Sequence, residues 1–320
     1  MTEQGFIRRR EGAWKEFELL ISGSRREISG RASGFPRAFR ELTQDLNTAR
    51  AHGFDPALVE RLNILVGEGN QILYSRHGFS FRTFADFVLR VFPRAVRSQW
   101  RGLGAAFLVF YGLTFFFAVL CVRFPDAVFE FMGETQADAI EEMYDPESEH
   151  FLTPRDVTTD ADMFGYYIYN NISVAFRTFA GGILAGIGSL FILSFNGIFL
   201  GVAAAHIINL GYSKTFFPFI IGHSSFELTA IIFSAQAGLL LGYRFFITRG
   251  LSRGASVRMA GKDALPIITG SALLIVIAAS IEAFWSSRAE LPMRLRIGAG
   301  IAGWVLLLLY FLFSGRGKAK

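Results

Sequence analysis

The sequence predicts an all-α, polytopic membrane protein with a helical cytoplasmic N-terminal domain, on three observations. Of the 320 residues, 52% are apolar and only 18% are charged, whereas a soluble domain carries about 25% charged residues. The charges are also unevenly distributed, because residues 1–103 hold 17 Lys/Arg and 11 Asp/Glu. Later runs are uncharged over the roughly 20 residues that a bilayer-crossing helix needs. This composition excludes two classes of protein: a soluble enzyme with one compact core, and a nucleic-acid-binding domain.

The cytoplasmic domain, residues 1–100, is predicted to be helical. Asp55-Pro56 indicates a helix start, with an N-cap followed by a first-turn proline. The Phe-rich stretch 79–88 leads to Pro93 and the first span, and two interpretations stay open: an interfacial helix on anionic lipid, or a helix packed on its own bundle. The apolar residues that recur at helical spacing are Trp14, Phe17, Leu20, Ile21, Phe39, Leu42, Leu46, Leu58, Leu62, Leu65 and Val66.

The transmembrane domain, residues 101–320, is predicted to contain about six spans. Residues 176–210 form an apolar run of about 35 residues. As one straight helix it would be about 52 Å long, more than a bilayer core requires. We therefore place a break at Asn196-Gly197, a turn-forming pair. The predicted spans lie near residues 104–122, 166–194, 197–209, 215–243, 266–285 and 297–313.

The loops between these spans predict their direction. Residues 123–165 carry 12 acidic and 2 basic residues, whereas residues 244–263 carry 5 basic and one acidic residue. Because Lys and Arg concentrate in cytoplasmic loops, we expect an acidic external loop 123–165, a basic cytoplasmic loop 244–263, and both termini in the cytoplasm. A re-entrant hairpin formed by 197–221 is the competing topology, but it would export the basic loop.

Polar residues inside the spans are the candidate site, because ionisable groups are costly in a bilayer. Pro218 and the glycine that precedes His223 predict a broken helix near 218–224, with Ser224 as N-cap and Glu227 completing a capping box. Two interpretations of Glu227 stay open: a functional carboxylate, or a helix cap that bonds across the break. The predicted intramembrane polar site comprises Asn196, His206, His223, Ser224 and Glu227.

The spacing of His223 and Glu227, at i and i+4, is that of two metal ligands or of a proton relay pair. Two ligands do not make a metal site, so the sequence predicts no metal and no cofactor. It also shows no H-E-x-x-H and no G-x-S-x-G motif. We therefore expect no enzymatic activity.

Two glycine pairs at four-residue spacing predict close helix packing. They are Gly182 with Gly186 and Gly197 with Gly201. Small residues at this spacing let helix backbones approach within a bundle or across a dimer interface. Both interpretations stay open, and we expect a homo-oligomer (dimer or higher).

Several motifs in combination resemble the stage II sporulation protein M-like family of integral membrane proteins. The chain departs from the family's usual His-Gly at His223-Ser224, while the following Glu227 is kept. The motifs that carry the resemblance are Asn170-Asn171-Ile172, Phe179-Ala180-Gly181-Gly182, Phe195-Asn196-Gly197, Gly222-His223-Ser224-Ser225-Phe226-Glu227 and Ala237-Gly238.

This resemblance implies a scaffold or subunit of a cell-envelope-associated complex in the bacterial cytoplasmic (inner) membrane. The sporulation member acts in a complex that supports peptidoglycan remodelling, but relatives occur widely without sporulation, so that role is not carried over. Many relatives occur beside MoxR-type ATPases, which makes such an ATPase, or another envelope protein, the implied partner alongside the lipid bilayer. We expect no nucleic-acid partner. The alternative function is a channel or transporter with a polar intramembrane site around a discontinuous helix.

Overall fold

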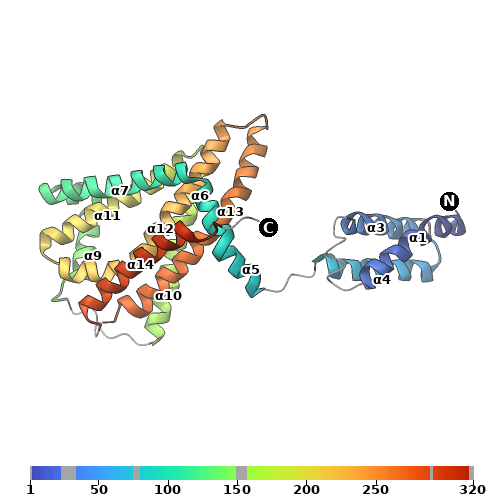
Figure 1. Ribbon diagram of the computed structural model, residues 1–320, viewed down its shortest axis with the longest axis horizontal. Helices are drawn as coiled ribbons and strands as arrows, with labels where there is room; N and C mark the ends of the chain where they lie inside the picture. Colours follow the sequence, from blue (N-terminus) through green and yellow to red (C-terminus); the bar gives the residue numbers. More distant parts are fainter. Residues whose placement is uncertain (1, 23–33, 75–79, 149–156, 289–290, 317–320) are drawn as a thin grey trace. The chain divides into compact units, whose positions relative to one another are not determined.

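The computed structural model describes residues 2–22, 34–74, 80–148, 157–288 and 291–316, and every regular element in these ranges is helical (Figure 1). The chain divides into two compact units, Met1–Ser80 and Phe81–Lys320. The all-helical class and the helical N-terminal region predicted from the sequence are therefore confirmed.

The N-terminal unit contains three helices, α1 (Glu3–Ser22), α3 (Phe35–Ala51) and α4 (Pro56–Tyr74). The apolar residues predicted from helical spacing, except Leu20, form its core or pack against it, and Trp14 and Leu62 are fully buried. Burial of such side chains contributes about 1.5–3 kcal/mol each. This unit therefore packs around a core of its own.

One buried polar contact fixes how α1 meets α3. Asp45 accepts a hydrogen bond of 2.8 Å from the Trp14 indole and one of 2.7 Å from the Arg10 guanidinium.

At the start of α4, the Asp55 carboxylate accepts a hydrogen bond from the Ala57 amide at 2.8 Å. The predicted cap at Asp55-Pro56 is confirmed.

The membrane unit opens with α5 (Phe81–Asp86), η1 (Phe87–Val91) and α6 (Phe92–Ser98). The two halves of this segment differ. Phe81 is 76% exposed, whereas Phe92 is buried against the rings of Phe233 and Phe311. Within the stretch 79–88, Phe87 stacks on Phe92 and packs against the bundle core, so bundle packing is correct for this end of the stretch. Lipid contact of the exposed α5 stays a prediction, and residue 79 lies outside the described residues.

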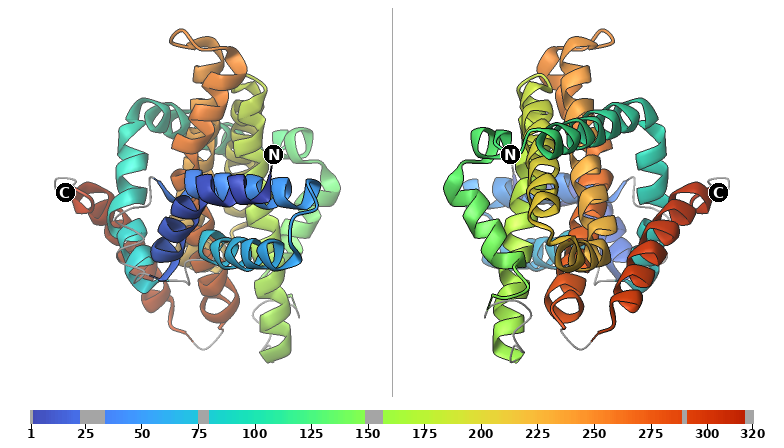
Figure 2. Two further views of the ribbon diagram at one scale, coloured as in Figure 1. Left: turned by 90° about the vertical axis from the view of Figure 1, so that its right-hand side faces the viewer. Right: turned by 90° about the vertical axis from the view of Figure 1, so that its left-hand side faces the viewer.

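Within the described residues, five helices are long and apolar enough to cross a membrane, so the membrane-spanning class is confirmed (Figures 1 and 2). The sequence predicted about six spans. The sixth long helix of the unit, α10 (Val157–Ala180), packs against α11, α12 and α13 but is less apolar than the five. The five are α7 (Trp100–Arg123), α11 (Ile187–Leu210), α12 (Ser213–Phe246), α13 (Arg253–Ile281) continued by η3 (Glu282–Ser286), and α14 (Met293–Phe313).

The predicted break at Asn196-Gly197, which separated spans 166–194 and 197–209, is wrong. Helix α11 runs through this pair without interruption. The chain instead turns between α10 and α11, through the short helix η2 (Gly181–Ile183) and left-handed residues at Ala185 and Gly186. The turn-forming tendency of Asn-Gly is overridden because Gly197 packs on α7, where a Cβ would lie 2.7 Å from the Phe110 carbonyl oxygen.

The predicted broken helix near 218–224 is also wrong, because α12 continues through Pro218 and Gly222 for 34 residues. At 1.5 Å per residue this is about 51 Å, longer than a bilayer core. The ends of α12 and α13 project together as a hairpin beyond the neighbouring helices (orange, Figures 1 and 2). The excess length therefore extends the hairpin rather than breaking the helix.

All four glycines of the predicted packing face contact backbone within the same chain. Gly197 and Gly201 lie on α7, and Gly182 and Gly186 lie on Gly238 and Gly242 of α12. The structure thus gives these residues a role in packing inside the bundle. The expected homo-oligomer does not follow from them.

The first part of the predicted acidic loop 123–165 forms two helices, α8 (Ala127–Met132) and α9 (Glu134–Tyr144), separated by Gly133 at φ +80°. Residues 149–156 lie outside the described residues, and α10 begins at Val157. Their apolar residues pack on the ends of α11 and α12. In particular, Tyr144 contacts the Phe216 ring, and its carbonyl accepts from the Thr215 hydroxyl at 2.6 Å. This places α9 over the first turns of α12.

Candidate functional site

The membrane unit brings one imidazole and two carboxylates together. His223 and Glu227 lie one turn apart on α12, with Nε2 and Oε2 separated by 3.8 Å. Glu282, the first residue of η3, completes the group, and one ligand atom from each residue lies within 4.8 Å of the other two. His223 is buried, while both carboxylates are half-buried. We refer to His223, Glu227 and Glu282 as the His–Glu–Glu cluster.

The local backbone explains why these side chains meet. Residues 282–286 form a π-helix, a form that is rare and frequently occurs at functional sites. Helix α12 approaches it closely at Gly222, where a Cβ would lie 3.0 Å from Ser286 Oγ. As a result, the Ser286 hydroxyl lies 3.4 Å from His223 Nδ1. The imidazole therefore presents Nδ1 to a hydroxyl and Nε2 to a carboxylate.

A cavity of about 510 Å³ reaches Glu227 and Glu282 from between α9, α10, α12 and η3. Its wall combines apolar side chains with carboxylates, phenols and amides, so it can hold a hydrated or charged ligand. The other polar residues that line it are Glu142, Tyr144, Tyr166, Tyr167, Asn170, Asn171 and Ser287.

Tyr144 closes one side of this cavity from α9. Its burial, followed by the nearby negative charge of Glu282, raises the pKa of the Tyr144 phenol well above its ordinary value. The phenol is therefore neutral at physiological pH. It adds an uncharged oxygen to the acidic wall.

Asn170-Asn171 lies inside α10, which begins at Val157. This pair therefore does not cap the start of the helix. The Asn170 amide donates to the Asn171 side-chain oxygen at 3.0 Å, and both residues line the cavity.

Of the predicted polar site, the structure joins His223 and Glu227 but not Asn196 or His206. The Asn196 amide donates to its own helix at the Ile192 carbonyl, 2.8 Å away. His206 Nε2 instead lies 3.7 Å from Glu141 of α9. Ser224 is buried beside His223 inside a continuous helix, so its predicted role as N-cap, and the capping box with Glu227, are wrong.

The residues that the predicted site missed are Glu282 and Ser286. Glu282 stands out in the sequence as a lone acid near the end of an apolar run. Their depth in the membrane was a signal that could have found Glu282. Glu282 lies near the end of α13 and His223 near the start of α12, and because these helices are antiparallel neighbours, the two residues lie at a similar depth.

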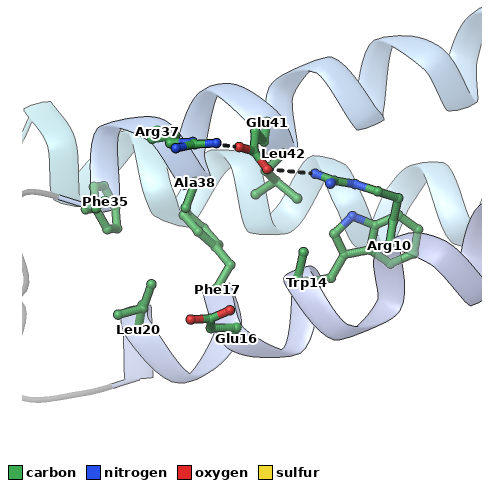
Figure 3. Close-up of a pocket in the computed structure, with 12 residues that line it drawn as sticks. Arg10, Trp14, Glu16, Phe17, Leu20, Phe35, Arg37, Ala38, Glu41 and Leu42 are labelled. Atoms are coloured by element: carbon green, nitrogen blue, oxygen red, sulfur yellow. Dashed lines mark hydrogen bonds and ion pairs between the residues drawn. The ribbon is translucent and has the colours of Figure 1, made fainter.

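A second cavity, of about 440 Å³, lies in the N-terminal unit between α1 and α3 (Figure 3). Trp14 and Phe17 form its floor, and Glu41 lies between Arg37 and Arg10 at its rim. Hydrogen bonds from Arg37, and then from Arg10, hold the pKa of the Glu41 carboxyl below its ordinary value. These exposed ion pairs stabilise the domain only weakly.

Two different family models match the chain, one in each of its two compact units. A model of a domain of unknown function matches residues 4–75, and no solved structure matches the chain. An uncharacterised protein of Methanocaldococcus jannaschii is 32% identical over 123 residues, covering 38% of this chain and 69% of that protein. The model of stage II sporulation protein M matches residues 106–287, more than half of the chain. The chain therefore belongs to the stage II sporulation protein M family.

Proposed function

We propose that this protein is the membrane subunit of a cell-envelope-associated complex, with the N-terminal unit as its site for partner proteins. The observation that carries the proposal is the division of the chain into two units, each with its own core. Residues 4–75 also match a domain model separate from that of the membrane unit. A self-contained helical domain joined to a membrane unit suits a subunit that links the bilayer to other proteins. The proposal assigns no enzymatic reaction to the chain.

The surface of the N-terminal unit supports this role. A groove between α1 and α4 has a volume of about 900 Å³ and is lined by Ile64, Leu65 and several carboxylates. Ile64 is 52% exposed there. Ile21, Ala57 and Leu65 line the groove beside it, and an apolar patch rimmed by charges is typical of protein-interaction surfaces. A MoxR-type ATPase or another envelope protein is the partner that the family resemblance suggests.

A photo-cross-linking amino acid at Ile64 tests the proposal in the full chain within native membranes. We expect one dominant adduct with another protein, identified by mass spectrometry. The matched control is Asn47, which is exposed on α3 and does not line the groove. Equal labelling at Ile64 and Asn47, together with migration of the chain alone on a native gel, would reject the subunit role. The same gel measures the proposed homo-oligomer.

The proposed topology in the cytoplasmic membrane, with α10 as the sixth crossing and both termini inside, is tested by cysteine labelling. Asp138 on α9 and Gly254 in the first turn of α13 are both exposed. After Cys121→Ser, we expect a membrane-impermeant maleimide to label Asp138→Cys in intact cells and Gly254→Cys only after lysis. Labelling of Gly254→Cys alone in intact cells would reverse the orientation.

A second function, that of a channel or transporter, is favoured by the cavity that ends on Glu227 and Glu282. The expected discontinuous helix no longer supports it, because α12 is unbroken. Charged residues at membrane depth nevertheless mark substrate and ion pathways.

A further inference from the structure

We propose that the His–Glu–Glu cluster binds a divalent ion of the first-row transition metals, such as Zn²⁺ or Mn²⁺. One imidazole nitrogen and two carboxylate oxygens from three side chains form a common ligand set for such ions. The nitrogen ligand favours them over Mg²⁺ and Ca²⁺, which take oxygen ligands. This inference does not depend on the subunit role.

The orientation of His223 supports binding through Nε2. The imidazole is 5% exposed, and Nδ1 lies 3.4 Å from the Ser286 hydroxyl. Nε2 points toward Glu227 at 3.8 Å, beyond hydrogen-bond distance. Metal-binding histidines have this arrangement, in which a second partner at one ring nitrogen fixes the ring and the other nitrogen binds the ion.

The spacing and charge of the cluster also fit a dication. Metal–ligand bonds of about 2.0–2.2 Å place ligand atoms about 3–4 Å apart, and the three ligand atoms here lie within 4.8 Å of one another. Small side-chain rotations therefore close the site. Two carboxylates this close repel each other, and one divalent ion neutralises both.

The cavity gives the ion a route to the cluster and further ligands. Glu227 and Glu282 line its wall, and the Tyr144 and Asn171 side chains add uncharged oxygen ligands nearby. Water in the cavity supplies the remaining positions of a site with three protein ligands. Because the cavity gives access to the cluster, a bound ion can exchange with ions in solution.

The test measures metal binding to the purified full chain in detergent, after treatment with EDTA. The protein is dialysed separately against Zn²⁺, Mn²⁺, Mg²⁺ and Ca²⁺, and bound metal is measured by mass spectrometry. We expect about one Zn²⁺ or Mn²⁺ per chain and no stoichiometric Mg²⁺ or Ca²⁺. Electron paramagnetic resonance of the Cu²⁺-loaded chain should show nitrogen coupling, and that coupling should be lost in His223→Gln.

Three variants separate a built site from general attraction to an acidic cavity. Glu282→Gln should weaken Zn²⁺ binding by roughly 100-fold or more, and Ser286→Ala, which alters a positioning residue, by about 10–100-fold. The matched control Glu142→Gln removes a carboxylate from the same wall but outside the cluster, and should bind as the parent does. Size-exclusion profiles of the metal-free proteins verify folding. No stoichiometric binding by the folded parent chain, or equal losses in Glu282→Gln and Glu142→Gln, would overturn the proposal.

Discussion

Replacing Gly182 with valine is expected to prevent the membrane unit from assembling. A Cβ at Gly182 would lie 2.6 Å from the Cα of Gly238 and 2.7 Å from its carbonyl carbon. These atoms are backbone, so no side-chain rotation relieves the overlap, and η2 must separate from α12. Overpacking with side-chain neighbours already costs about 1–3 kcal/mol, and a clash between backbones should exceed this, against a total stability of about 5–15 kcal/mol.

Gly112→Val is the matched control, because Gly112 also lies in a membrane-spanning helix and has nothing within 4 Å of its Cβ position. Fluorescence-detected size exclusion of both variants should show aggregation or loss of Gly182→Val and a parent-like peak for Gly112→Val. A monodisperse Gly182→Val with the parent's thermal midpoint would show that the contact between η2 and α12 is not required.

The sequence predicted the helical membrane class well because the solvent dictates it. Long uncharged runs at 104–122 and 297–313 correspond to α7 and α14 within a few residues. The middle of the chain was harder. Asn196-Gly197 has turn chemistry but lies inside α11, whereas the actual turn at Ala185 and Gly186 was interpreted only as helix packing. Local propensity could not show which glycines face another backbone, because that depends on tertiary packing.

Only part of the site could be predicted, because its remaining residues are brought together by tertiary packing. His223 and Glu227 share one helix, so their proximity follows from the i, i+4 spacing alone. Glu282 comes from another helix, and its proximity depends on the register between α12 and α13. The π-helix at Glu282–Ser286 directs Ser286 toward His223, and no sequence pattern predicts it. Asn196 and His206 were predicted as members of the site because a polar residue in an apolar run indicates membrane depth, but not the direction in which its side chain points.

Glu227→Gln is expected to have the largest effect on the proposed transport function while leaving the fold intact. Glutamine keeps the shape of the side chain but removes a charge that lies beside a second carboxylate, Glu282. Since that removal relieves repulsion, the thermal midpoint should not fall by more than about 2–4 °C, which corresponds to about 1 kcal/mol in a unit of this size. Binding of a cation in the cavity should instead fall by roughly tenfold or more.

Flux measurements on the full chain in liposomes decide between the two functions. Zn²⁺ entry is followed with a trapped zinc dye and proton entry with a trapped pH dye, for the parent, Glu227→Gln and the control Glu142→Gln. A transporter should show flux in the parent and in Glu142→Gln, with Glu227→Gln near the protein-free background. Absence of both fluxes in the parent would reject transport for these cations and leave the subunit role standing, since a subunit needs only the bilayer unit and its partner domain. A large fall in the thermal midpoint of Glu227→Gln, with flux retained, would instead make this carboxylate structural, because the charge would then stabilise the contact between α12 and η3 without serving a ligand.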